Sequence, residues 1–173
     1  EQHEGARLTT FAEAAAAAEV VVNATNGFGA MPALEAAGAD NLAGKLLIDI
    51  SNPLDFSRGF PPTLFVKDDD SLGEQIQRAY PEARVVKTLN TMNANLMVRP
   101  QELGESSSVF VSGNDASAKA TVTELLESFG HTDVIDLGDI TTARGAEMIL
   151  PIWVRLMGSL GTSMFNFKVV RQA

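Results

Sequence analysis

Two patterns of hydrophobic and polar positions alternate along the chain. Short runs of aliphatic and β-branched residues alternate with stretches in which apolar residues recur at helical spacing. The short runs span residues 19–24, 45–50, 84–89, 107–112 and 132–137. Such runs are typical of strands in a mostly parallel sheet, and the first is apolar enough to be buried on both faces. The alternation predicts an α/β fold with five strands in one sheet and helices on both of its faces.

Capping signals mark the helices between these runs. Thr10 and Glu13, and again Ser71 and Glu74, have the spacing of a capping box, in which each residue's side chain bonds the backbone of the other. A glycine, which commonly ends helices, follows two of the helical stretches. These signals predict helices over residues 11–18, 31–37, 71–79 and 116–129, with a turn over 25–30.

Two segments have less regular patterns. Residues 54–70 contain prolines and aromatic residues without clean periodicity, which predicts an ordered excursion over the edge of the sheet. From Thr142 we expect a long helix that reaches Gly161 and is kinked at Pro151. Because this helix is apolar nearly all round, it needs cover from another domain or subunit.

Length and composition fit a globular protein with a real core. The 173 residues are 45% hydrophobic, which suits one compact domain. We divide the chain into an α/β domain over 1–140 and a C-terminal helical extension over 141–173. The extension is expected to pack on the domain or on a dimer partner.

Charge and cysteine content exclude several functions. Without cysteine there is no disulfide, thiolate nucleophile or cysteine-ligated metal, which agrees with a reducing cytoplasm. The net charge of -9 argues against nucleic acid. The longest apolar stretch, 148–160, contains Arg155 and is too short to cross a membrane. Because Glu1 opens the sequence and no signal peptide follows, the chain resembles a segment of a longer protein.

Small polar residues follow the predicted strands. Open parallel sheets bind ligands beyond the carboxyl ends of their strands. Amides and hydroxyls at such ends can bond a ribose, a carboxamide or a phosphate without adding charge. Turn and capping chemistry accounts for any one of these segments, but the set favours a ligand site. The segments are 23–29, 49–53, 87–93 and 112–115.

Gly27-Phe28-Gly29 resembles half of a dinucleotide-binding fingerprint, but the third glycine is missing and Pro32 lies near its position. The segment therefore predicts a strand-to-helix turn, where free N–H groups could meet a cofactor's phosphates or nicotinamide. Only 19 residues precede Val20, where the apolar part of the first predicted strand begins. A βαβ unit with a phosphate loop needs about 30 residues, so we expect that loop to be absent.

Other catalytic schemes have weaker support. Tyr80 has no lysine four positions on, as the Tyr/Lys pair of short-chain dehydrogenases requires. His3 and His131 lack ligand or triad spacing, and a surface role is favoured for His131. Asp68-Asp69-Asp70 favours a solvated acidic loop over a metal site. Trp153 and its methionine and phenylalanine neighbours suit a planar-cofactor pocket and core or dimer packing equally well.

Five segments together resemble one enzyme family. In chain order they are VVVNAT at 20–25, LIDISNPL at 47–54, VVKTLNTMN at 85–93, FVSGND at 110–115 and TARGAEMILPIWVRL at 142–156. In this order and spacing they are similar to the NADP oxidoreductases dependent on coenzyme F420, also called NADPH-dependent F420 reductases. The similarity extends over nearly the whole chain, and the combination is more specific than any one segment.

The resemblance implies a Rossmann-type domain with a small C-terminal helical extension, which forms a homodimer. It also implies hydride transfer between the nicotinamide of NADP(H) and the deazaflavin of coenzyme F420. Catalysis between two hydride carriers rests mainly on alignment of their rings. The lack of a clear acid, base or nucleophile is therefore expected for this activity.

The resemblance also implies site residues. Contacts to the nicotinamide half and its neighbouring wall would come from Asn23, Ala24, Thr25, Asn26, Gly27, Asn52 and Pro53. Contacts to F420, the second substrate, would come from Lys87, Thr88, Leu89, Asn90, Thr91 and Trp153. Lys87 could favour negative charge on the reduced deazaflavin, although a strand-end lysine is more often a simple surface charge.

The sequence departs from the family at its start. Family members begin with a strand, a G-x-G-x-x-G-type loop and a second strand that selects NADP over NAD, and this unit is absent here. We therefore expect the chain by itself to bind NADPH weakly and to expose an apolar strand edge. Two alternatives stay open: an NADP-dependent reductase of a flavin, metal chelate or imine, and a non-catalytic NAD(P)-sensing module.

Overall fold

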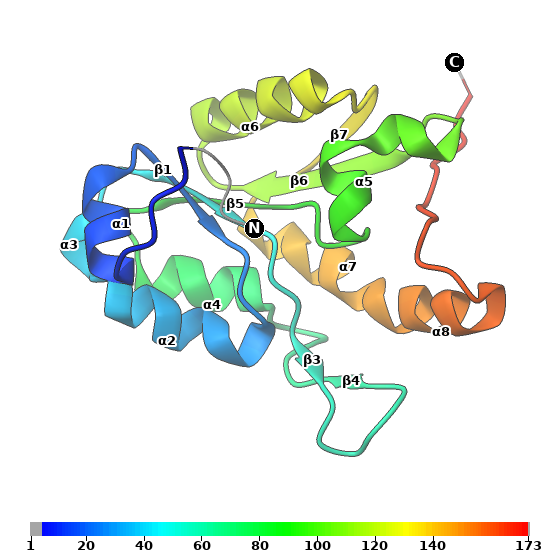
Figure 1. The fold of residues 1–173 in the computed structure, drawn as a ribbon, viewed down its shortest axis with the longest axis horizontal. Helices are drawn as coiled ribbons and strands as arrows, with labels where there is room; N and C mark the ends of the chain where they lie inside the picture. Colours follow the sequence, from blue (N-terminus) through cyan, green and yellow to red (C-terminus); the bar gives the residue numbers. More distant parts are fainter. Residues whose placement is uncertain (1–4, 173) are drawn as a thin grey trace.

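A single five-stranded sheet organises the protein, which we describe from a computed structural model over residues 5–172; His3 lies outside this range. The strand order is β1-β2-β5-β6-β7, and all neighbours are parallel except β5 and β6 (Figure 1). The predicted mostly parallel sheet is confirmed. The strands are β1 (Val20–Asn23), β2 (Leu46–Asp49), β5 (Arg84–Thr88), β6 (Ser108–Gly113) and β7 (Asp133–Gly138).

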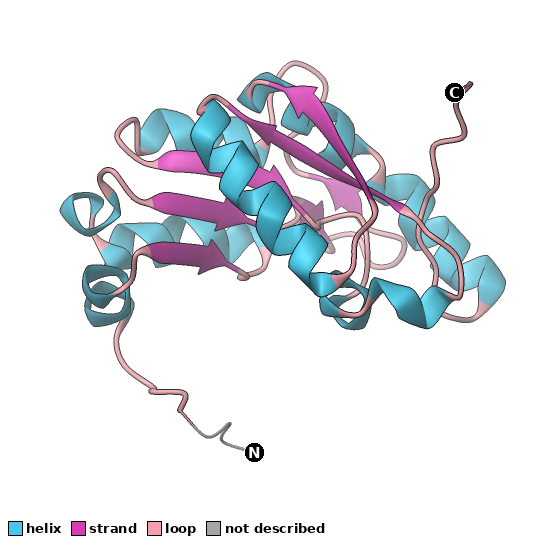
Figure 2. Cartoon of the chain, turned by 90° about the horizontal axis from the view of Figure 1, so that it is seen from above, coloured by secondary structure: helices cyan, strands magenta, loops and turns pink. Residues whose placement is uncertain are grey.

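Helices cover both faces of this sheet, as Figure 2 shows. One apolar core joins Leu47 and Val85 to α1 (Phe11–Ala17), α2 (Gly27–Ala37), α3 (Ala39–Leu42), α4 (Leu72–Ala79) and α7 (Ala143–Met148). A second core joins Ile48, Val86 and Val109 to α5 (Ala94–Val98) and α6 (Ala116–Phe129). Alternate side chains of the central strands thus enter opposite cores, which explains the continuous apolar runs.

The capping signals locate the helix starts well. The Thr10 and Glu13 capping box forms at the start of α1. At α4, Ser71 accepts from the backbone of Glu74, but the Glu74 carboxylate bonds the Ser71 hydroxyl and a distant arginine. The helix predicted over 31–37 begins earlier, at Gly27, because the Asn26 side chain caps it. Most of the predicted turn is therefore the first turn of α2.

Strand β1 lies at an edge of the sheet, and its burial differs from the prediction. Val20 and Val22 are 43% and 53% exposed, so the expectation of burial on both faces is wrong. The reason is topological, because β1 pairs with β2 alone among the described strands. The expected exposed apolar edge is present.

The irregular segments take definite shapes. Residues 54–64 form a hairpin in which β3 (Leu54–Asp55) and β4 (Thr63–Leu64) pair antiparallel, so the ordered excursion is confirmed. The predicted kinked helix is present as two segments: a 3₁₀ turn (Ile140–Thr142) precedes α7, and Ile149, whose backbone stays helical, separates α7 from α8 (Leu150–Leu160), which ends at Gly161. Pro151 occupies the first turn of α8, where its missing N–H costs little.

A second 3₁₀ turn (Pro100–Leu103) follows α5. After α8 the chain returns along β6, where Ser108 donates to the carbonyl of Phe167. None of the helices within residues 5–172 combines the length and hydropathy that a bilayer-crossing segment requires.

Candidate functional site

The carboxyl ends of β1, β2 and β5 meet at one edge of the sheet because these strands are parallel. Residues 112–115, which the sequence suggested would join them, lie at the opposite edge. That expectation is wrong because β6 runs antiparallel to β5, pairing Val86 with Gly113 and Thr88 with Val111. The site must therefore be built from three strand ends rather than four.

A cavity of about 830 Å³ opens beyond the ends of β1 and β2. Its walls are the turn into α2, the connection from β2 into the β3–β4 hairpin, and one side of α5. Among the predicted cofactor residues, Ala24, Thr25, Asn26, Gly27 and Asn52 line it. The volume is within the usual range for small-molecule sites.

The two other predicted cofactor residues, Asn23 and Pro53, are buried directly behind this cavity. They support its walls through their neighbours in the chain. The wall formed by Ala94 and Met97 of α5 was not predicted from the sequence.

Gly27 has a packing role at the entrance to this cavity. A Cβ atom at this position would lie 2.1 Å from the carbonyl oxygen of Asn52 and 2.9 Å from the Cα of Pro53. Any side chain would push α2 away from the turn that follows β2. The first glycine of Gly27-Phe28-Gly29 is thus explained by close backbone contact, without a phosphate ligand.

Asn52 carries an unsatisfied acceptor beside the cavity. Its Nδ2 donates to the carbonyl of Asn90 at 3.2 Å, whereas its Oδ1 is buried and has no partner among the described residues. A buried acceptor without a donor is costly, so such an atom at a cavity wall suits a ligand N–H or O–H group.

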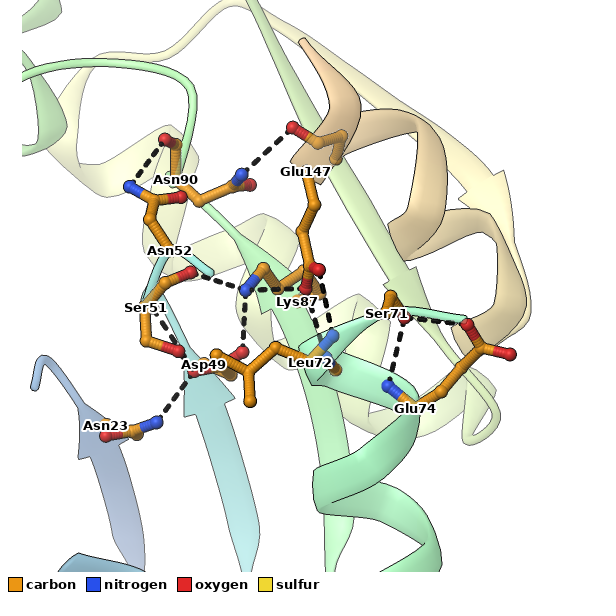
Figure 3. Close-up of polar contacts among 12 residues, drawn as sticks. Asn23, Asp49, Ser51, Asn52, Ser71, Leu72, Glu74, Lys87, Asn90 and Glu147 are labelled. Carbon is orange, nitrogen blue, oxygen red and sulfur yellow. Dashed lines mark hydrogen bonds and ion pairs between the residues drawn. The ribbon is translucent and has the colours of Figure 1, made fainter. Parts of the chain in front are cut away.

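Lys87 lies at the centre of a buried ionic network (Figure 3). Its side chain is 0% exposed, and its Nζ is 2.7 Å from Asp49 Oδ2 and 3.1 Å from Glu147 Oε1. It also donates to the carbonyl of Ser51 at 2.5 Å. Burial alone would lower the pKa of Lys87, but the two carboxylates outweigh it and raise that pKa.

The network continues to the cavity through Asp49. Asp49 Oδ1 accepts from Asn23 Nδ2 at 2.8 Å and from the Ser51 hydroxyl at 2.6 Å. Asn23 Oδ1 in turn accepts from the hydroxyl of Thr25, which lines the cavity. Figure 3 shows these groups converging from the ends of β1, β2 and β5. The ion pairs therefore fix the relative positions of the strand ends.

Glu147 of α7 connects the same network to α4. Its carboxylate accepts from the backbone N–H groups of Leu72 and Gly73 at 2.8 and 3.0 Å. These are the first two residues of α4, where free N–H groups and the helix dipole favour a negative charge. This second carboxylate thus has partners besides Lys87, which compensates for the excess of negative charge.

A neighbouring ion pair strengthens the junction between α4 and α7. Arg144 binds both oxygens of Glu74, at 2.9 and 2.6 Å. Hydrogen bonds from Arg144 hold the pKa of Glu74 below its usual value despite its burial. The bidentate geometry is the strongest form of such a pair.

The predicted F420 contacts on the β5 end are enclosed. Residues 87–91 are each at most 9% exposed and do not line the cavity. Asn90 Nδ2 donates to the carbonyl of Ala146 at 3.0 Å, and Thr88 donates to that of Phe110 at 2.7 Å. Leu89 has a positive φ of 60°, which turns the chain sharply at the end of β5. The alternative of an exposed surface charge at Lys87 is wrong.

Two other aromatic or imidazole side chains differ from expectation. Trp153 does not line the cavity; its ring stacks on Phe165 with centroids 5.1 Å apart. His131 is 2% exposed, so the predicted surface role is wrong. Its Nε2 bonds the carbonyl of Met97 at 3.0 Å, at the end of the α5 wall. Burial lowers the pKa of His131, and its bond to Met97 only partly offsets this effect.

Asp68 and Asp69 are exposed, as predicted for a solvated loop. Asp70 is partly buried and pairs with Arg78. Within residues 5–172 we find no cluster of three or more histidine, aspartate or glutamate side chains with a geometry for metal binding.

Comparisons with known proteins place the chain among reductases. No family model matches it. The rat (Rattus norvegicus) metalloreductase STEAP3 is 33% identical over 120 residues, which cover 66% of this chain and 22% of that protein. The F420-dependent NADP reductase of Methanocaldococcus jannaschii is 28% identical over 118 residues, which cover 68% of this chain and 52% of that protein. The chain thus spans about a fifth and about half of these two relatives.

A solved structure gives a much stronger similarity. A crystal structure from Arthrobacter sp. FB24, provisionally described as an F420-dependent NADP-reductase, is 69% identical to this chain. The two superimpose with a TM-score of 0.92 over 93% of this chain and 74% of that one. At this identity and coverage, both fold and ancestry are shared. The chain belongs to the F420-dependent NADP reductase family.

Proposed function

We propose that the protein transfers a hydride between NADP(H) and the deazaflavin of coenzyme F420. The observation that carries the proposal is the cavity beyond β1 and β2, whose lining combines polar and apolar side chains. Thr25, Asn26 and Asn52 are among the polar lining residues, and Leu54 and Met97 are among the apolar ones. Such a lining suits the nicotinamide and the deazaflavin, because the nicotinamide carries an amide group and both flat rings must be shielded from water.

The residues present fit a nicotinamide. Asn52 Oδ1 is a buried acceptor without a donor, and Thr25 and Asn26 supply neutral polar groups beside it. We propose that these three residues hold the nicotinamide half of NADP(H), which supplies the hydride when bound. The chain's own contribution is to orient the ring and to keep water from the reacting atoms.

Lys87 and residues 88–91 have a supporting role in this proposal. Their burial makes direct contact with F420 less suitable than positioning the strand ends from behind. The ion pairs to Asp49 and Glu147 keep the Asn23 and Ser51 segments fixed while the cavity opens to ligands. For Trp153 we keep the role predicted from the sequence, which is to cover a cofactor ring or to contact a partner subunit.

We also propose a homodimer that forms through the C-terminal extension, residues 141–173, in a cytoplasmic protein. Apolar side chains of α7 and α8 are exposed: Met148 is 41%, Ile152 is 55% and Leu160 is 57% exposed. Exposed apolar helix faces commonly pack against a second subunit. Light scattering after size exclusion tests this proposal, and a strictly monomeric mass at micromolar concentration contradicts it.

A second candidate has a specific observation in its favour. The similarity to a metalloreductase covers 66% of the chain at 33% identity, so a metal chelate is an alternative electron acceptor. The same cavity could then bind a flavin that passes electrons onward. The two candidates share NADPH as donor and differ in the acceptor.

Stopped-flow absorbance with the intact protein separates these functions. NADPH is mixed with oxidised F420, with FMN, or with FMN and a ferric chelate, and loss of NADPH absorbance is followed. We expect rapid oxidation of NADPH in the mixture with F420 and not in the two mixtures with FMN. Oxidation only with flavin, or only when ferric chelate is present, contradicts F420 as the acceptor. NADPH binding without oxidation in any arm supports a sensing module instead.

A further inference from the structure

The β3–β4 hairpin projects from the body of the protein (Figure 1). Leu54 and Asp55 of its first strand line the cavity. Its ladder has two residue pairs, Leu54 with Leu64 and Asp55 with Thr63. Backbone bonds fix its base, since Leu54 donates to Asn52 at 2.8 Å and Phe65 donates to Pro53 at 3.0 Å. The hairpin is thus anchored to the turn that carries Asn52 but is thin along its length.

Exposed phenylalanine side chains stand out on and near this hairpin. Phe56 is 56% exposed and Phe60 is 63% exposed, and Phe28 at the start of α2 is 60% exposed. Exposed aromatic rings of this size leave much apolar area in water, so a group of them calls for a binding role.

Two of these phenylalanines line the cavity, and one does not. Phe28 and Phe56 lie on its wall together with Leu54, whereas Phe60 is absent from the lining. Phe28 is already stacked on Phe65, with centroids 4.4 Å apart and an interplanar angle of 29°. This contact fixes the Phe28 ring from behind, while Phe56 has no aromatic partner among the described residues.

We propose that Phe56, with Phe28, forms the surface that receives the tricyclic ring of the hydride acceptor and so selects acceptors with a flat, fused ring. The inference rests on the proposed function and names a specificity determinant within the same cavity. Thr25, Asn26 and Asn52 supply polar groups to the same cavity; we assign these to the nicotinamide and the two phenylalanine rings to the acceptor. Stacking on a phenylalanine tolerates changes in ring substituents but requires planarity.

A matched pair of variants on one hairpin tests this proposal. Phe56→Ala removes the ring from the cavity wall, and Phe60→Ala removes an equally exposed ring from the same hairpin outside the cavity. Phe56→Trp keeps a stacking surface and serves as the conservative variant. Binding of oxidised F420, FMN and NADPH to the intact protein is measured separately, by quenching of deazaflavin or flavin fluorescence and by calorimetry.

We expect Phe56→Ala to raise the Kd for F420 or FMN about tenfold, within the range known for aromatic stacking on a base. Phe60→Ala should change each Kd less than twofold, Phe56→Trp should restore acceptor binding, and all variants should bind NADPH within twofold of wild type. Equal acceptor binding by Phe56→Ala and Phe60→Ala overturns the inference but leaves the proposed function intact. A larger loss for NADPH than for the acceptor overturns the assignment of Phe56 to the acceptor ring. Failure of the wild-type protein to bind either tricyclic ring overturns both proposals.

Discussion

Replacing Lys87 by methionine removes the ammonium group on which Asp49 and Glu147 converge. Methionine has a similar length and would fill the same space between β2, β5 and α7. Asp49 and Glu147 are at most 1% exposed, so both carboxylates would then be buried without this cation. Their remaining partners are neutral: Asn23 and Ser51 for Asp49, and two backbone N–H groups of α4 for Glu147.

The expected loss follows from the burial of those charges. Removing one partner of a buried ion pair costs about 3–5 kcal/mol, because the other charge is left uncompensated. For a domain of this size, about 4 kcal/mol corresponds to a fall in Tm of roughly 8–16 °C. Lys67→Met is the matched control, because Lys67 is 60% exposed and 3.7 Å from the exposed Asp68. Its effect should be below about 1 kcal/mol.

Urea denaturation followed by circular dichroism measures both variants across pH. The pKa of Lys87 is raised in the folded protein above its ordinary 10.5. Its contribution is therefore fully present below pH 10.5 and is lost as pH rises through the folded pKa. The stability difference between wild type and Lys87→Met should be constant from pH 7 to 9 and narrow above pH 10.5. A variant within 1 kcal/mol of wild type at pH 7 would refute this account of the network.

Three further changes have definite expected outcomes. Gly27→Ala should lower the free energy of unfolding, measured by urea denaturation, by about 1–3 kcal/mol, because the new Cβ would lie 2.1 Å from a backbone oxygen. The same change should weaken ligand binding in the cavity. Gly29→Ala is the control and should cost less than half as much, because the nearest atom to its Cβ is a side-chain oxygen at 3.3 Å. The folded-state pKa of His131 is lowered, so wild-type stability should fall as pH drops below 6.5, and His131→Gln should lack that dependence. The Arg78 pair lowers the pKa of Asp70 to about 2, so its contribution is present above pH 3.8 and lost as pH falls toward 2; Asp70→Asn should cost about 1 kcal/mol at pH 7, and equal unfolding midpoints there would contradict this.

Local signals in the sequence predicted the helix starts and the strand runs well. The Thr10 box and the glycine that ends α6 are short-range features, and each forms as expected. The interruption predicted at Pro151 is present two residues earlier, at Ile149. Pro151 has no N–H to donate to the carbonyl of Glu147, so the helical hydrogen-bond ladder is interrupted at this point.

The direction of β6 could not be deduced from strand and helix alternation. An alternating pattern favours parallel pairing, yet the segment after β5 contains a short α5 and a 3₁₀ turn instead of one long crossover helix. With that connection β6 returns antiparallel and carries residues 112–115 away from the cavity. The polar ends of β1 and β2 therefore lie at the cavity, whereas the polar end of β6 does not.

The buried ion pair shows why the sequence predicted only part of the candidate site. Asp49 and Lys87 occupy paired positions in adjacent parallel strands, so an acid and a base at the ends of two apolar runs were the available signal. Glu147 lies 60 residues beyond Lys87, in a helix whose apolar composition suggested dimer contacts, and nothing local links it to α4. Charged residues at strand ends are usually exposed, and that general expectation favoured the wrong environment for Lys87.

In this sheet the polar strand ends divide into two layers: Thr25, Asn26 and Asn52 face the cavity, while the charged groups behind them hold that layer in place. Residues of the two layers lie within a few positions of each other at each strand end. The register of β1, β2 and β5 therefore decides which of these residues face the cavity and which hold them in place.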